Sequence, residues 1–175
     1  MEISGKKVLV LGGAGLVGRS VCRILVNEGV KKLIISSLFE WEAETFIKEL
    51  KSEMNCEGIE FATAGGNLFV REEFKDLSRN QILDDNQRRK IFIHDTIEPL
   101  TKSILEESAL YKLIVKHQPD IVIDSINTAT AVAYQDIFSA TMDVANQIDE
   151  LRKNQAARRP GRAAAAGPDA QEPRR

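Results

Sequence analysis

The chain has 175 residues, of which 43% are hydrophobic and 29% are charged, a balance typical of one soluble globular domain. Its formal net charge of -2 gives no electrostatic footprint for nucleic acid or an anionic membrane, so we expect neither partner. Gly12 breaks the first apolar run too early for a secretory signal, and nothing approaches the roughly 18 apolar residues of a membrane helix. We therefore expect a cytoplasmic protein.

Three short apolar runs, at residues 7–11, 33–35 and 121–123, predict β-strands buried in a sheet. A further strand is expected at residues 59–63. After the first run, apolar side chains recur at helical spacing: Val17, Val21, Ile24 and Leu25. Gly29 stands where this helix would end, and a second amphipathic helix is expected over residues 43–54. Strands that alternate with helices predict right-handed crossovers and a parallel sheet in an α/β fold.

The pattern loosens between residues 71 and 100, where charged side chains predominate. We interpret this stretch as a polar insertion with one or two short helices. A helical stripe returns over residues 110–114, and Pro119 ends that helix before the fourth strand. A final helix is expected over residues 129–151.

Residues 152–175 change composition abruptly to Ala, Arg, Pro and Gly. Such a basic segment cannot bury enough apolar surface to offset its ordering entropy, so we expect it to be disordered. It is interpreted as a nucleic-acid-binding arm, as a solvated tail, or as a segment foreign to the fold that follows a truncated or frameshifted reading frame. The third interpretation is favoured because the composition breaks in mid-fold, which leaves residues 1–151 as the folded domain.

A glycine-rich loop, Gly-Gly-Ala-Gly-Leu-Val-Gly, follows the first predicted strand and opens the first helix. This is the context that a dinucleotide-binding fingerprint requires. Its glycines permit a tight turn, close approach of the backbone to a pyrophosphate, and packing of the helix on the strand. The pyrophosphate would lie on free N–H groups at the positive end of the helix. The predicted contacts are Gly12, Ala14, Gly15, Leu16, Val17 and Gly18.

The Gly-x-x-Gly-x-x-Gly spacing resembles the extended short-chain dehydrogenase/reductase superfamily, which includes NAD-dependent sugar-nucleotide epimerases and dehydratases. Three more segments resemble it in order and spacing: Ser36-Ser37, Gly66-Asn67-Leu68, and the Pro-Asp-hydrophobic run at residues 119–123. The resemblance covers residues 6–145. It implies a Rossmann-type, doubly wound sheet in the order 3-2-1-4 and a bound NAD or NADP.

The resemblance also implies roles for individual residues. Ser36 and Ser37 would read the adenosine ribose, Asn67 and Leu68 would contact adenine, and Ser125 would lie beside the cofactor after the fourth strand. The ribose reader of NAD-preferring members is acidic, whereas Ser36 is neutral, and Arg19 would either accept a 2'-phosphate or face solvent. The cofactor therefore stays NAD or NADP. Asp124, unusual at its position, would border the cofactor or cap the next helix.

No catalytic residue and no metal site is predicted. The family's Tyr-x-x-x-Lys pair is absent, because neither Tyr111 nor Tyr134 has a lysine four residues later. His94 lies in the polar stretch and His117 at a helix end, where structural roles are expected. Cys22 falls in an apolar helical pattern and is expected to be a buried thiol.

The sequence thus predicts the NAD(P)-binding part of an oxidoreductase or sugar-nucleotide epimerase/dehydratase that lacks its catalytic half and is not active alone. The fourth strand would be an exposed edge, covered by a second copy or a partner subunit. One alternative is a non-catalytic dinucleotide-binding or sensing module. Another is a degenerate P-loop over residues 13–20, in which Arg19 replaces the lysine that reaches the terminal phosphates.

Overall fold

A computed structural model describes residues 2–126, 144 and 146–154 of the chain. Contacts between Cα atoms divide it into two units, residues 1–135 and 136–175, which are described separately. The first unit contains these elements in chain order: β1 (Lys7–Leu11), α1 (Leu16–Asn27), β2 (Lys32–Ser37), α2 (Glu40–Glu53), β3 (Glu60–Gly65), η1 (Glu72–Phe74), α3 (Arg79–Leu83), α4 (Asn86–Ile97), α5 (Lys102–Glu107), α6 (Ala109–His117) and β4 (Ile121–Asp124).

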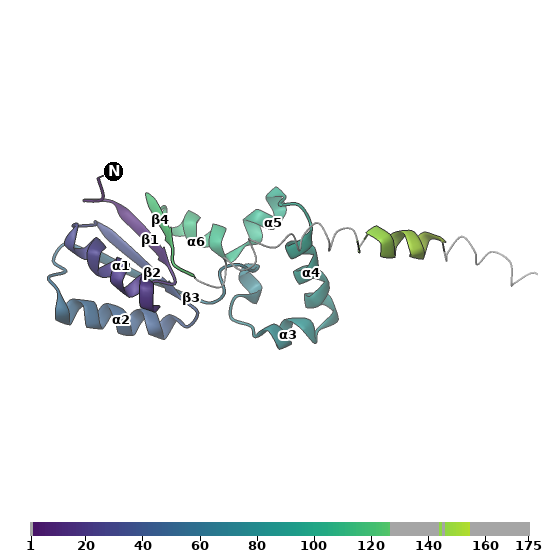
Figure 1. The fold of residues 1–175 in the computed structure, drawn as a ribbon, viewed down its shortest axis with the longest axis horizontal. Helices are drawn as coiled ribbons and strands as arrows, with labels where there is room; N and C mark the ends of the chain where they lie inside the picture. The colour runs from purple at the N-terminus through teal and green to yellow at the C-terminus, as the bar shows by residue number, and fades with distance from the viewer. Residues whose placement is uncertain (1, 127–143, 145, 155–175) are drawn as a thin grey trace, which may run out of the picture. The chain divides into compact units, whose positions relative to one another are not determined.

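The strands form one parallel sheet in the order β3-β2-β1-β4, which confirms the predicted topology (Figure 1). In its central register, Leu9 of β1 stands opposite Ile34 of β2 and Val122 of β4. Each connection within the sheet crosses over through helical segments, as parallel strands require. The sheet order reverses direction at β1, because the chain adds β2 and β3 on one side of it and β4 on the other.

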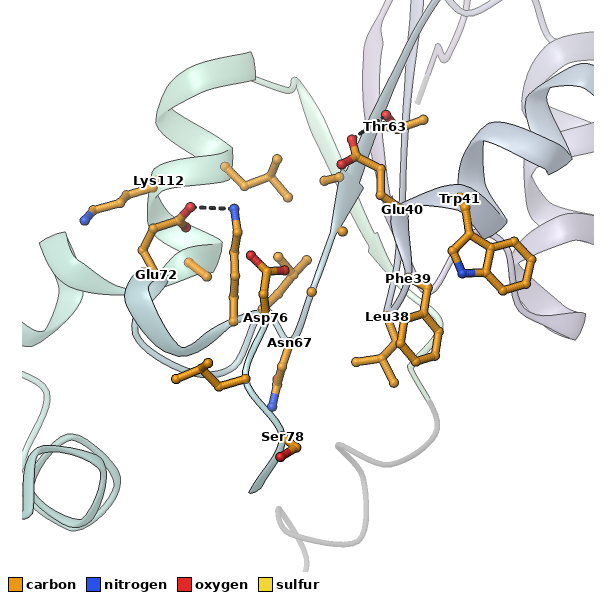
Figure 2. A pocket seen from close by; sticks show the side chains of 18 of the residues that line it. Leu38, Phe39, Glu40, Trp41, Thr63, Asn67, Glu72, Asp76, Ser78 and Lys112 are labelled. Carbon is orange, nitrogen blue, oxygen red and sulfur yellow. Dashed lines mark hydrogen bonds and ion pairs between the residues drawn. The ribbon is translucent and has the colours of Figure 1, made fainter. Parts of the chain in front are cut away.

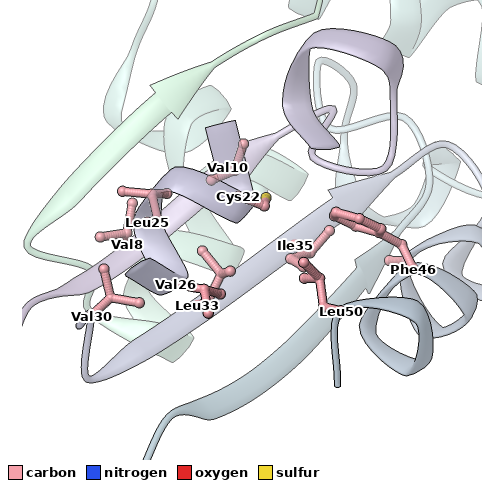
Figure 3. Packing of buried hydrophobic residues seen from close by; sticks show 11 residues of the cluster. Val8, Val10, Cys22, Leu25, Val26, Val30, Leu33, Ile35, Phe46 and Leu50 are labelled. Carbon is pink, nitrogen blue, oxygen red and sulfur yellow. The ribbon is translucent and has the colours of Figure 1, made fainter. Parts of the chain in front are cut away.

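Helices cover both faces of the sheet, which confirms the doubly wound α/β class (Figure 1). On one face, Val10 and Ile35 pack with Cys22 of α1 and Phe46 of α2, all fully buried (Figure 3). On the other face, Leu9, Leu11, Ile34 and Leu68 pack against Ala109 and Leu113 of α6. Successive side chains of β1 and β2 therefore point alternately into two cores, and both sets are buried. This explains why the two strands are unbroken apolar runs in the sequence.

The buried stripe of α1 differs from the predicted one. Gly18, Cys22, Leu25 and Val26 face the sheet, whereas the side chains of Val17 and Ile24 are 62% and 59% exposed. Close contact between Gly18 and the loop before the helix fixes which face points inward. The expected ending holds, because Gly29 adopts φ +71° directly after the helix. The prediction of a buried thiol at Cys22 is confirmed.

The outer strands are less buried than the sequence indicated. β4 was expected to be a buried strand at an exposed edge of the sheet; the side chain of Val122 is 45% exposed, and burial alternates along the strand. β3 begins at residue 60 and continues to residue 65, and none of its described residues is fully buried. Both strands pair on one side only within the described part of the chain, so an apolar composition there does not require burial of both faces.

The polar stretch over residues 71–100, where one or two short helices were expected, contains a 3-10 turn and two α-helices, α3 and α4. A further helix, α5, follows it and was not predicted. Each α-helix starts at a side-chain cap: Ser78 accepts from the Gln81 N–H, Asp85 from the Gln87 and Arg88 N–H groups, and Thr101 from the Ile104 N–H. Side-chain caps therefore mark where these helices begin. An apolar stripe does not mark α4, which buries none of its described side chains.

In the second unit, residues 144 and 146–154 are helical. The helix that was predicted to end at residue 151 therefore ends at residue 154 in the described part of the chain. Ion pairs one turn apart, Asp149–Arg152 at 3.7 Å and Glu150–Lys153 at 3.6 Å, favour the extra residues. The remainder of this helix prediction and of the tail prediction lies outside the described residues.

Candidate functional site

The loop between β1 and α1 is packed so closely that its glycines are sterically required. A Cβ on Gly18 would stand 2.2 Å from the Gly12 carbonyl oxygen and 2.6 Å from the Gly13 Cα. A Cβ on Gly13 would stand 2.9 Å from Ile35 Cγ2. Gly12 adopts φ +68°, a left-handed conformation that favours glycine. The loop therefore brings the start of α1 against the end of β1 with no room for side chains.

The start of α1 presents open backbone donors to solvent. Gly15 is the N-cap and supplies no capping side chain, and the first backbone bond of the helix runs from the Arg19 N–H to the Gly15 carbonyl. Within the described chain, the N–H groups of Leu16, Val17 and Gly18 therefore have no partner in the helix. The first turn carries no acidic residue, and Gly15 and Leu16 are exposed. An anion placed here would meet three N–H groups and the positive end of the helix.

The loop lies at the point where the sheet order reverses, beside the end of β4. The Ser125 N–H donates to the Leu11 carbonyl at 3.0 Å, and its hydroxyl donates to the same oxygen at 2.6 Å. A Cβ on Gly12 would stand 3.0 Å from Ile126 Cγ1 and 3.4 Å from the Ser125 carbonyl. In open α/β sheets, this crevice outside the carboxyl ends of the strands is where ligands bind. The structure thus brings Ser125 to the glycine loop, with its hydroxyl engaged by the backbone.

Ser36 lies beneath the glycine loop. Its side chain is 1% exposed, and its hydroxyl accepts from the Gly12 N–H at 3.3 Å and donates to the Val10 carbonyl at 3.4 Å. The backbone bond from the Gly13 N–H to the Ser36 carbonyl, 2.8 Å long, adds a second link. Ser36 therefore positions the loop and has no free hydroxyl for a ribose. Ser37, the last residue of β2, is half-buried and donates its hydroxyl to the Glu42 carboxylate.

Arg19 is turned away from the open end of α1. Its guanidinium donates to the Ala14 carbonyl at 2.9 Å, pairs with Glu49 of α2, and stands 4.6 Å from the ring centre of Phe46. Neither of the two predicted positions, facing solvent or facing a 2'-phosphate, describes this arrangement. The same contacts weaken the P-loop alternative, because its cation is held against α2. Asp124, which was expected to border the cofactor or to cap the next helix, accepts from the Ile126 N–H at 2.8 Å.

A cavity of about 930 Å³ opens at the ends of β2 and β3 (Figure 2). The predicted residues Asn67 and Leu68 line it; Asn67 is exposed and Leu68 is 5% exposed. The Asn67 side-chain oxygen accepts from the Phe69 N–H at 3.1 Å, which leaves its amide NH₂ directed to the opening. The cavity does not include the glycine loop, so the sequence-predicted residues occupy two adjacent regions of one sheet edge.

Sequence reasoning missed the other side of this cavity. Leu38, Phe39 and Trp41 follow β2 with more than half of each side chain exposed, and the rings of Phe39 and Trp41 stack at 6.4 Å (Figure 2). Exposed aromatic residues directly after a buried strand were the available signal. Lys75 from the polar stretch also lines the cavity, and its bond to Glu72 raises the pKa of its ammonium group. No sequence pattern pointed to Lys75.

The remaining candidate groups have structural surroundings. Asp95 accepts two bonds from Arg71 at 2.8 and 3.0 Å, and His94 Nδ1 lies 3.3 Å from its carboxylate. Burial lowers the pKa of His117, whose Nε2 has no partner among the described residues. Those residues hold no cluster able to ligate a metal and no helix long and apolar enough to cross a membrane. Tyr134 lies outside them.

The fold and this sheet edge define an α/β protein with a Rossmann-type parallel sheet. No family model matches the chain, and no curated protein matches it in sequence. Among solved structures, the ligand-free 5-ketofructose reductase of Gluconobacter sp. strain CHM43 is similar with a TM-score of 0.32 and 24% identity, over 38% of this chain and 23% of that one. Pen from Bacillus thuringiensis is similar with a TM-score of 0.39 and 13% identity, over 71% and 39%. The chain thus spans less than two fifths of either protein, and these likenesses carry no argument about activity.

Proposed function

We propose that this chain binds a nicotinamide dinucleotide, NAD or NADP, and serves as the cofactor-binding part of an oxidoreductase or epimerase/dehydratase of the short-chain type. The observation that carries the proposal is the glycine loop. At its end, three N–H groups at the start of α1 have no partner in the helix, and Gly13 and Gly18 leave no room for a side chain between β1 and α1. A pyrophosphate is the ligand whose charge and shape suit such a cradle. The steric demands at Gly13 and Gly18 make the cradle specific.

The residues of the chain would bind and orient the dinucleotide. The N–H groups of Leu16, Val17 and Gly18 would hold the pyrophosphate, with Ser36 fixing the loop from below. The adenine end would enter the cavity beside Asn67 and Leu68. The nicotinamide end would lie toward Ser125, on the β4 side of the sheet. When bound, the cofactor supplies hydride transfer, and the surrounding chain contributes placement and charge.

A purely binding or sensing role is the second candidate. It is favoured by the sequence itself, in which no tyrosine has a lysine four residues later to serve as an acid/base pair. Under this reading the chain would bind the dinucleotide without turning it over. A panel of sugar nucleotides and small carbonyl compounds, supplied with NADH or NADPH, separates the two: turnover supports an enzyme, and binding without turnover supports a sensor.

The test of the common proposal is a titration of the whole chain with NADH, followed by fluorescence or calorimetry, in wild type and in Gly15→Asp. Aspartate is a good N-cap residue, and Gly15 already has φ -75° and ψ 172°, so we expect the variant to fold. Its carboxylate would occupy the N–H groups and repel the pyrophosphate. We expect at least a tenfold loss of NADH affinity, about 1.4 kcal/mol.

The matched control is Asn55→Asp, which changes the charge by the same amount in the loop after α2, at the opposite edge of the sheet. Its new carboxylate can accept the Glu57 N–H as the amide does now, so NADH affinity should not change. Unchanged affinity in Gly15→Asp would move the cofactor away from the loop. No binding of either dinucleotide by wild type, together with magnesium-dependent binding of ATP, would replace the proposal with the P-loop alternative.

A further inference from the structure

The end of β2 holds a carboxylate that the sequence does not place there. Strand β2 ends in Ser36 and Ser37, neither of which is acidic. The Ser37 hydroxyl, however, donates to the Glu42 carboxylate, which reaches back from the first turn of α2. The positive end of that helix stabilises a negative charge at this position. Glu42 is half-buried, so its carboxylate remains in contact with solvent.

In dinucleotide-binding sheets, the end of β2 is where the protein reads the adenosine ribose. An acidic residue there accepts a hydrogen bond from the 2'-hydroxyl of NAD, whereas a nearby arginine accommodates the 2'-phosphate of NADP. Resting on the proposed function, we infer that Glu42, held by Ser37, supplies this acidic group and makes the site specific for NAD(H) against NADP(H). A 2'-phosphate would bring negative charge against the carboxylate, and like charges placed together weaken binding.

Three of the cations near this strand end are engaged in ion pairs. Arg19, the cation on the first turn of α1, is paired with Glu49 and stacked over Phe46. Of the lysines that line the neighbouring cavity, Lys75 is bonded to Glu72 at 2.5 Å. Lys112 is bonded to Glu107 at 2.9 Å, and that bond lowers the pKa of the glutamate. A 2'-phosphate that drew on Arg19, Lys75 or Lys112 would have to break one of these pairs, whereas Arg79 and Lys116 also line the cavity.

The site also has a second carboxylate close to the same strand end. Glu40, the first residue of α2, accepts from the Thr63 hydroxyl of β3 at 2.8 Å (Figure 2). A Cβ on Gly65 would stand 2.7 Å from the Glu40 Cβ, so the start of α2 packs directly on the end of β3. Glu40 and Glu42 thus lie in one turn that is fixed to two strands, and both add negative potential where a 2'-phosphate would enter.

The experiment compares dissociation constants for NADH and NADPH in wild type, Glu42→Gln and Glu44→Gln. We expect wild type to bind NADH about tenfold tighter or more. In Glu42→Gln the amide can still accept from Ser37, but the charge is gone, so NADPH affinity should rise about tenfold and NADH affinity should fall two- to threefold. Glu44→Gln removes the same charge from an exposed position on the same helix and should leave both constants unchanged.

Raising the salt concentration provides a second readout, because screening weakens charge repulsion. The preference of wild type for NADH should shrink between about 0.05 and 1 M salt, whereas the smaller preference of Glu42→Gln should change less. Equal affinity of wild type for the two dinucleotides, or an unchanged ratio in Glu42→Gln, would overturn the inference while the proposed function stands. Failure of wild type to bind either one would instead overturn the proposed function.

Discussion

Two regions of this chain reach ordered structure by different physical routes. The region from β1 to α2 is built on burial: Val10, Ile35 and Phe46 are fully buried, and Gly13 and Gly18 have no space for a side chain. The stretch over residues 71–107 buries far less, and its helices start at polar caps. The proposed pyrophosphate cradle belongs to the first region, because rigid packing is what fixes backbone N–H groups in advance of a ligand.

The second region is held together by an internal ion pair and by single buried apolar side chains. Arg71 donates two hydrogen bonds to the Asp95 carboxylate of α4. The side chains of Phe74, Ile82 and Ile104 are buried. Such contacts order a segment without fixing it as closely as a packed core does. This region forms one wall of the cavity at the ends of β2 and β3. The comparison predicts that identical kinds of change will cost very different amounts in the two regions.

The largest expected effect is Phe46→Ala, which empties a fully buried site between α2 and the sheet. We expect the free energy of unfolding to fall by about 3–5 kcal/mol, because the cavity loses both transfer energy and packing contacts. The counterpart in the polar region is Ile93→Ala, whose side chain is 45% exposed, and we expect a loss under about 1 kcal/mol. Urea unfolding followed by circular dichroism measures both. Similar losses would mean that the two regions form one equally packed core.

The next largest effect is expected for Gly18→Ala, which should lower the free energy of unfolding. Inside a helix this change normally stabilises by about 0.5–1 kcal/mol. Here the new Cβ would meet backbone atoms of Gly12 and Gly13, so we expect a loss of about 2–3 kcal/mol. Ser20→Ala, at an exposed position on the same helix, is the control and should change stability by less than about 0.5 kcal/mol. Stabilisation of the protein by Gly18→Ala would show that the loop is looser than described.

The smallest effect concerns Asp95 and depends on pH. Partial burial by itself raises the pKa of the Asp95 carboxyl, but hydrogen bonds from Arg71 and His94 outweigh it and hold the pKa below its usual value. A carboxyl whose pKa is lowered by folding contributes stability above its unfolded pKa of about 3.9 and loses it as the pH falls through the folded value. Asp95→Asn should therefore cost about 1–2 kcal/mol at pH 7.

The difference between wild type and Asp95→Asn should close as the pH falls through the lowered folded pKa of Asp95, below which both side chains are neutral. Glu98→Gln, an exposed change just after the same helix, is the control and should leave the pH dependence unchanged. Thermal unfolding from pH 2 to 7 gives the measurement. If the stability difference between wild type and Asp95→Asn stayed constant with pH, the Arg71–Asp95 contact would stabilise the protein through packing and not through charge.

Prediction from the sequence succeeded where one physical cause dominates. The parallel order β3-β2-β1-β4 follows from unbroken apolar runs and short helical connections, and the structure confirms it. The prediction was wrong for the inward face of α1 and for Val122, because both depend on which neighbour packs against the element. The helix α5 was not predicted, since its cap at Thr101 leaves only a weak signal in the sequence.

By itself, the sequence determined the fold class, the place of the glycine loop and the lack of a Tyr-x-x-x-Lys pair, because these depend on local spacing and residue type. Only the tertiary structure decided what the polar side chains do. It buried Ser36 under the loop, turned Arg19 toward Glu49, and brought the Glu42 carboxylate to Ser37 at the end of β2. These contacts join separate elements, and their geometry is set by how the helices dock on the sheet. The cofactor preference inferred for this site therefore depends on packing that local sequence patterns do not encode.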